Sequence, residues 1–247
     1  MSKSNAVSNQ SLQLHNNVQE ALKSFQSIEP KALKTTDYSK VLTSTLAATQ
    51  KSVTIEIAPD DLTLLKQSGY KLCFAKKVGN EAYNVVWQSY DKYLSNNGFS
   101  WTPQYQLFGS NTFQADVTVK VSTNIVTIGL GQKSELSPEG LLGPAVTAGP
   151  DISITLANEY GPIHPGINQL STGVDGKQVS TPIYVATNQV VTGDTVLTPV
   201  ETILVWFEQN VQTSTMFSTS RSKAIEIDLT AVNDATRLYE NGKWKTV

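Results

Sequence analysis

The pattern that most constrains this chain is an alternation of apolar and polar residues that begins at residue 53. Val53, Ile55 and Ile57 alternate with Thr54 and Glu56. Successive side chains of a β-strand point to opposite faces, so the alternation predicts a half-buried strand. Similar runs recur at close spacing, at residues 71–76, 83–88, 104–108, 115–121, 125–130, 151–156, 182–186, 202–208, 212–218, 224–229 and 236–239. This succession predicts an all-β fold, mainly an antiparallel β-sandwich, either one large or two small.

Glycine and proline residues mark the expected breaks. Residues 138–150 contain six of them, which predicts a long loop or a linker between two β-rich halves. The halves would be residues 51–149 and 150–247, with one continuous sandwich over 51–247 as the alternative. A second stretch rich in glycine and proline, residues 161–176, predicts another long loop.

Two short local signals are more specific. Pro59 followed by two acidic residues predicts a short helix, with Gly69 placed to end it. Asn241-Gly242 between strand-forming residues predicts a tight hairpin turn near the end of the chain.

The first fifty residues follow a different period. Leu14, Val18, Leu22 and Phe25 fall on one face of a helix, which predicts a short helical N-terminal arm over residues 1–50. We expect the arm to dock on the main domain; the alternative is that it packs on a neighbouring subunit or is shed before activity. The segment lacks the apolar core of a secretory signal. We therefore expect synthesis in the cytoplasm, with any release by a non-classical route.

Charge and cysteine content narrow the functional classes. The chain has 19 Lys+Arg against 21 Asp+Glu, and no basic stripe stands out. Nucleic-acid binding is therefore not expected, because phosphate neutralisation needs clustered cations. Cys73 is the only cysteine, so no intrachain disulfide can form.

Groups for catalysis are scarce. His15 and His164 are the only histidines, and a nucleophilic triad or a Cys-His pair would need one of them. His164 lies in a turn-rich stretch, 160–166, that could present the ring to a ligand. Cys73 lies in an apolar run typical of an inert thiol. The carboxylates of Glu226 and Asp228 share a strand face that is expected to be wet. The sequence thus predicts no catalytic residues, no metal site and no cofactor.

The densest anomaly is a cluster of aromatic and amide side chains. Asn96-Asn97-Gly98 predicts a turn. The aromatic rings that flank it could point outward, to stack on sugars or to lie at a lipid surface. Alternatively, these rings pack in the core of the domain. The candidate ligand-binding residues, with His164 added, are Trp87, Tyr90, Tyr93, Asn96, Asn97, Phe99, Trp101, Tyr105 and His164.

These observations favour a non-enzymatic recognition protein that binds a glycan or a membrane surface through loops, as a homo-oligomer. In composition the chain resembles small cytosolic lectins and haemolysin-like toxins of microbes, a resemblance that includes no diagnostic motif. Thr- and Ser-rich alternation at 112–128 and 213–229 is typical of amphipathic hairpins, so a β-pore-forming toxin is the alternative. A self-assembling structural protein is the second alternative.

Overall fold

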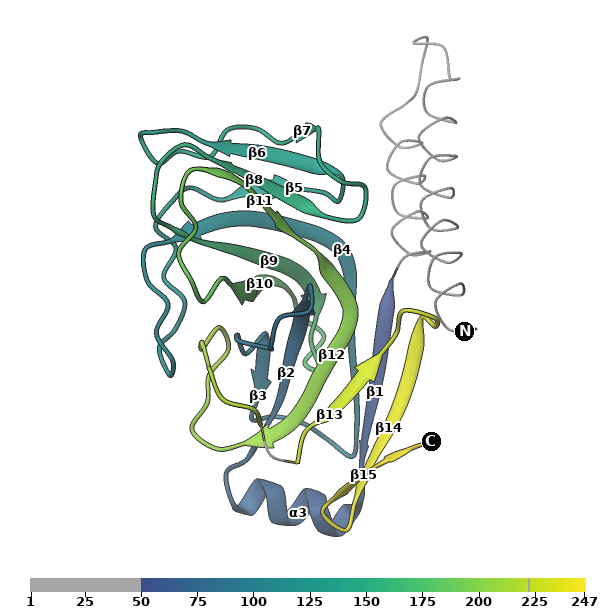
Figure 1. Cartoon of the computed structure of the whole chain (residues 1–247). Helices are drawn as coiled ribbons and strands as arrows, with labels where there is room; N and C mark the ends of the chain where they lie inside the picture. Colours follow the sequence, from purple (N-terminus) through teal and green to yellow (C-terminus); the bar gives the residue numbers. More distant parts are fainter. Residues whose placement is uncertain (1–49, 222) are drawn as a thin grey trace, which may run out of the picture.

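The computed structural model describes residues 50–221 and 223–247. The expected helical arm therefore lies outside the described residues, apart from Gln50. Within the described residues the predicted all-β fold is confirmed. Strands form three sheets, and one helix, α3 (Pro59–Gln67), lies at the end of the molecule opposite the smallest sheet (Figure 1).

The large sheet has seven strands in the order β10-β9-β4-β1-β14-β15, with β5 paired to β4. Its pairs are antiparallel except for β1 and β14, which run parallel. The long strand β4 joins the sheet together, because it pairs with β1 near its start and with β9 and β5 towards its end. The strands are β1 (Lys51–Ile57), β4 (Asn96–Ser110), β5 (Val126–Ile128), β9 (His164–Thr172), β10 (Gln178–Val185), β14 (Asp234–Glu240) and β15 (Lys243–Thr246).

Two four-stranded sheets complete the fold. The β12 sheet has the order β13-β12-β2-β3 and is antiparallel. The small sheet has the order β11-β8-β6-β7, and its central pair, β6 and β8, is parallel. Their strands are β2 (Lys71–Val78), β3 (Gln88–Tyr90), β12 (Pro199–Glu208), β13 (Ile225–Asp228), and β6 (Gln132–Leu136), β7 (Val146–Thr147), β8 (Ile154–Asn158), β11 (Gly193–Leu197).

The main core joins the large sheet to the β12 sheet in a sandwich-like arrangement. Phe74 of β2 stacks on Phe99 of β4 with ring centroids 4.2 Å apart. The opposite face of β2 is buried too, because Cys73 packs with Trp206 in a second cluster. A strand buried on both faces reads as a continuous apolar run, as residues 72–75 do.

Helix α3 forms where the sequence predicts it. Pro59 occupies its first turn with two acidic residues, and Gly69 after its end has a φ of 70°. A left-handed residue there costs glycine little, so the helix stops. Asp61 also accepts hydrogen bonds from the backbone N–H groups of Asn241 (2.7 Å) and Gly242 (3.0 Å). The helix is thereby tied to the predicted hairpin turn between β14 and β15.

The two halves of the sequence are interleaved. In each sheet, strands that precede residue 150 pair with strands that follow it: β1 with β14, β2 with β12, and β6 with β8. This pairing fits the alternative of one continuous domain over 51–247 and places the loop at 138–150 inside it.

Several local predictions are wrong. Residues 161–176, predicted to be a loop, contain β9, which lies between β4 and β10. Strand β9 needs a glycine at position 166 because the Phe108 ring packs directly on Gly166 and leaves no space for a side chain. The predicted turn at Asn96-Asn97-Gly98 is the start of β4, where these residues pair with β1. In both places tertiary pairing overrides turn propensity.

Three predicted strands are also wrong. Residues 83–87 precede β3, and residues 115–121 and 212–218 form only isolated bridges, such as Val85 with Met216 and Thr118 with Thr215. Val86 and Phe217 instead pack with Cys73 and Trp206 of the β12 sheet. Val85, Met216, Val117 and Val119 pack with Phe108 of β4 and Val185 of β10 in the large sheet, so burial, not ladder formation, explains these apolar residues. The amphipathic hairpins expected at 112–128 and 213–229 are therefore not present in the described residues.

Candidate functional site

Most of the predicted aromatic site residues belong to the core. Trp87, Tyr93, Phe99, Trp101 and Tyr105 are all at most 2 % exposed. The outward orientation proposed for them is therefore wrong. For Phe99, Trp101 and Tyr105 the reason is the extension of β4 through the expected turn, since alternate residues of a strand that crosses the sandwich must face its interior.

The remaining predicted residues have varied settings. The Asn97 amide is used locally, since its Nδ2 donates to Ile55 O (3.1 Å) and Leu94 O (2.7 Å). His164 is 8 % exposed, and its Nδ1 lies 2.7 Å from Ala186 O, so the ring is bonded to backbone and not presented to a ligand. Asn96 is exposed, and Tyr90 is half-buried.

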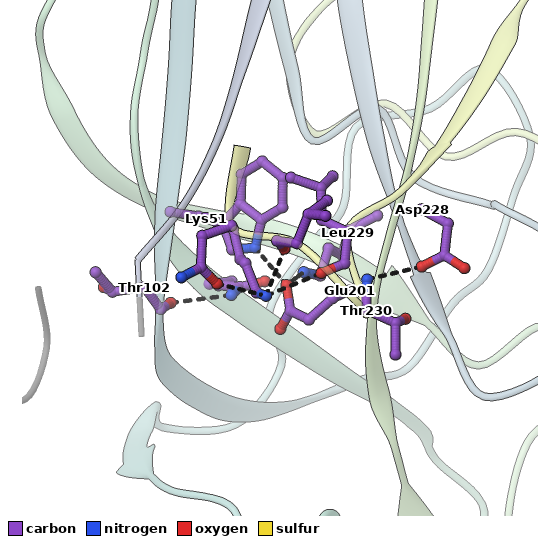
Figure 2. Close-up of polar contacts among 11 residues, drawn as sticks. Lys51, Thr102, Glu201, Asp228, Leu229 and Thr230 are labelled. Atoms are coloured by element: carbon purple, nitrogen blue, oxygen red, sulfur yellow. Dashed lines mark hydrogen bonds and ion pairs between the residues drawn. The ribbon is translucent and has the colours of Figure 1, made fainter. Parts of the chain in front are cut away.

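A polar cluster that sequence reasoning missed lies inside the sandwich; we call it the Glu201 cluster (Lys51, Lys76, Trp101, Glu201). Glu201 Oε2 accepts from Lys76 Nζ and from Trp101 Nε1, each at 2.7 Å. The Lys76 ammonium also lies 4.6 Å from the Trp101 ring centroid, in a cation–π contact. Figure 2 labels Glu201 together with Lys51 and Leu229 in this part of the core.

Lys51 closes the cluster at the start of β1. Its Nζ donates to Leu229 O (2.9 Å), Val232 O (2.7 Å) and Asn233 Oδ1 (2.9 Å), as Figure 2 shows in part. These bonds tie β1 to the connection between β13 and β14.

The charges of the cluster shift one another's ionisation. Burial by itself would raise the pKa of Glu201, but Lys76 and the Trp101 N–H hold it below its ordinary value. Burial lowers the pKa of Lys76, and Glu201 opposes this change. The Lys76 side chain is fully buried and the Glu201 side chain is 25 % exposed. Because a substrate cannot reach Lys76, we interpret the cluster as a structural contact between the sheets.

Polar atoms without protein partners lie in the same part of the core. Gln169 and Ser171, on β9, are register partners of Tyr105 and Trp101. Gln169 Oε1, Ser171 Oγ and Trp87 Nε1 are buried without a hydrogen-bond partner. Such atoms are ordinarily satisfied by internal water in proteins. These three buried polar atoms show that the core near Lys76 is partly polar. The many aromatic residues in this part of the sequence did not indicate that.

A surface cleft of about 600 Å³ lies at the helical end of the molecule, and we call it the α3 cleft. It is bordered by α3, by the connection from β3 to β4 and by the turn between β9 and β10. That volume is within the range of small-molecule sites. Its walls comprise Lys66, Gly69, Tyr70, Asp91, Lys92, Tyr93, Leu94, Asn97, Val174 and Asp175.

The cleft combines tyrosine rings with charged groups. Tyr93 donates its hydroxyl to Tyr70 O at 2.9 Å, which fixes the inner wall. Lys66 Nζ lies 5.8 Å from the centroid of the Tyr93 ring. Asp91 and Lys92 are exposed and make no hydrogen bond or ion pair with other described residues. The rim therefore keeps a free acceptor and free donors.

The structure thus brings two predicted residues, Tyr93 and Asn97, to one cleft and leaves the other seven outside its lining. Sequence reasoning missed Lys66, Asp91 and Asp175. Asp91 directly follows Tyr90, so its place in the aromatic segment was an available signal. Asp175 had no such signal, because the strand that positions it was taken for a loop.

No family model matches the chain, and no curated protein or solved structure matches it significantly. Among the described residues no helix is long and apolar enough to cross a membrane. Nor do residues 50–221 and 223–247 contain a group of three or more His, Cys, Asp or Glu residues that could hold a metal ion.

Proposed function

We propose that this protein recognises a glycan without catalysis and that the α3 cleft is the binding site. The observation that carries the proposal is the combination, in one cleft of about 600 Å³, of the half-buried ring of Tyr70 with the uncommitted carboxylate of Asp91. A tyrosine ring offers an apolar face to the C–H groups of a sugar. A free carboxylate accepts hydrogen bonds from two sugar hydroxyls.

The side chains outside the cleft that could act as nucleophiles or bases are not available for catalysis, which supports a binding role. Lys76 is buried and paired with Glu201, Cys73 is fully buried, and His164 bonds to backbone. Each of these potential nucleophiles or bases is engaged or inaccessible, whereas Lys66, Asp91 and Lys92 of the cleft are exposed. A recognition function is consistent with that distribution.

A glycan array and a titration of the best glycan would test the proposal. Asp91→Asn keeps the shape of the cleft but removes the charge on its acceptor, so affinity should fall about tenfold, since hydrogen bonds to charged groups are the stronger ones. Asp194→Asn is the matched control, because Asp194 is an exposed carboxylate of the small sheet at the opposite end of the molecule. No glycan binding, or equal affinity in Asp91→Asn and wild type, would contradict the proposal.

A membrane surface is the second candidate partner. Leu64 on α3 and Leu94 in the wall of the cleft are 62 % and 65 % exposed, so two large apolar side chains at this end of the molecule are available to contact lipid. Sedimentation with glycan-free vesicles would support this partner if Leu94→Ser reduced the bound fraction. Release of an entrapped dye in the same assay would favour the pore-forming alternative.

We also propose that the protein is a homo-oligomer, with open self-assembly as the alternative. Light scattering of the full chain measures both, since a closed oligomer gives one fixed mass and open assembly gives a mass that grows with concentration.

A further inference from the structure

Some charged side chains of the α3 cleft form ion pairs, whereas others have no partner of opposite charge. Asp175 forms an ion pair with Lys177 (3.6 Å), and its Oδ1 accepts from the Lys177 backbone N–H (3.2 Å). Lys66 and Lys92 have no carboxylate partner within the described residues, and Asp91 has no cationic one. The lining of the cleft therefore contains two ammonium groups without a carboxylate partner and one carboxylate without a cationic partner.

The position of Lys66 is partly fixed by its neighbours. It lies in the last turn of α3, where the helix dipole favours a cation, and its ammonium is near the Tyr93 ring. An ammonium group held at a concave wall attracts anions more strongly than one on a flat surface, because the protein excludes part of the screening water.

From this imbalance we infer that the α3 cleft binds an acidic saccharide, one that carries a carboxylate or a sulfate group. The anionic group lies between Lys66 and Lys92, a hydroxyl of the same or the next sugar donates to Asp91, and the ring contacts Tyr70. The inference rests on the proposed glycan recognition and adds the class of glycan.

An anionic lipid surface is a poorer fit to the same lysines. Asp91 lines the same cleft and would face the phosphate layer. A densely anionic surface binds best to clustered cations without interspersed carboxylates. A single acidic sugar, by contrast, needs both a cation and a hydroxyl acceptor.

The test compares matched pairs of glycans on the full chain. The probes are sialylated and asialo forms of one oligosaccharide, and sulfated and desulfated forms of one glycosaminoglycan. The acidic member of at least one pair should bind about tenfold more tightly at about 50 mM salt, with the difference shrinking at about 500 mM because salt screens exposed charges.

Charge-removing variants locate the contact. Lys66→Gln and Lys92→Gln should each reduce affinity for the acidic glycan by about five- to tenfold, and should reduce affinity for its neutral partner by less. Lys66→Arg should retain binding, which separates lost charge from lost packing over Tyr93. Lys133→Gln on the small sheet is the matched control, since Lys133 lies at the far end of the molecule.

These experiments test glycan recognition and the preference for acidic glycans separately. Glycan binding that depends on Asp91, but with neutral and acidic partners equal and both lysine variants silent, would overturn the acidic class and leave glycan recognition standing. Absence of binding to any glycan would overturn both. Binding to vesicles containing phosphatidylserine but no glycan, abolished by the lysine variants, would overturn the saccharide in favour of a lipid phosphate.

Discussion

Glu201 and Glu208, near the two ends of β12, make the same three-group contact on opposite faces of that strand. Oε2 of Glu201 accepts from Trp101 Nε1 and pairs with Lys76. Oε2 of Glu208 accepts from Trp206 Nε1 at 2.7 Å and pairs with Arg221 Nε at 2.9 Å. In both, one carboxylate oxygen joins an indole N–H to a cation.

Both cations also contact an aromatic ring. The Lys76 ammonium lies 4.6 Å from the Trp101 ring centroid, and the Arg221 guanidinium carbon lies 4.4 Å from that of Phe217. A carboxylate that satisfies an indole N–H needs a counter-charge once it leaves water. The two contacts therefore fix β12 against the large sheet on one face and against the 209–221 segment on the other.

The Glu201 cluster gives a prediction about stability. Glu201→Gln leaves the buried Lys76 ammonium without its counter-charge, so the free energy of unfolding should fall by about 3 kcal/mol. Lys76→Met removes that buried charge and should cost less, about 1 kcal/mol, because Glu201 keeps the Trp101 N–H and partial contact with water. Urea unfolding of both variants measures the difference, and an equal or reversed order would argue against a structural ion pair.

The same carboxylate sets an acid dependence. The pKa of Glu201 is lower in the folded protein than its ordinary value of 4.5, so its contribution is complete above that pH. The contribution is lost as pH falls through the lower folded pKa. We expect the unfolding free energy of the wild type to drop in acid more steeply than that of Glu201→Gln. Lys76→Met, which removes the responsible cation, should flatten the curve as well; parallel curves for all three proteins would refute the pairing.

Gly166 and Phe108 give a prediction about packing. A Cβ on Gly166 would lie 2.2 Å from the Phe108 ring, and that ring is fully buried. Gly166→Ala should therefore destabilise the protein by about 3 kcal/mol, near the upper end for overpacking. Gly98→Ala is the matched control, since Gly98 is also in a strand but a Cβ there meets nothing within 4 Å. Thermal unfolding that treats the two variants alike would contradict the close contact of β9 and β4.

The lone thiol should be silent in the native state. Cys73 has no exposed surface, and burial raises the pKa of its thiol, which keeps the nucleophilic thiolate scarce. An aromatic disulfide reagent should label the protein only as urea unfolds it, with labelling and circular dichroism following one transition. Stoichiometric labelling of the native protein at neutral pH would show that the β12 sheet opens locally.

Predictions from the sequence were accurate where the residues of a short segment determine its local structure by themselves. Pro59 starts α3, Asn241-Gly242 turns the last hairpin, and the run through Cys73 is a buried strand. In each case backbone geometry or periodicity within a few residues decides the outcome. The candidate site was predicted less well, because only Tyr93 and Asn97 of the predicted residues line the α3 cleft.

The sequence by itself determined that this is an all-β chain with a short helix after its first strand, because alternation with period two is a local property of the residues. Only the tertiary structure decided that Trp87 and Trp101 face inward, that Lys76 meets Glu201 across 125 residues of sequence, and that Asp91 and Lys66 share one cleft. Alternation states that one face of a strand is buried but not which other strand covers it. That choice is made by pairing between distant segments, which no single segment encodes.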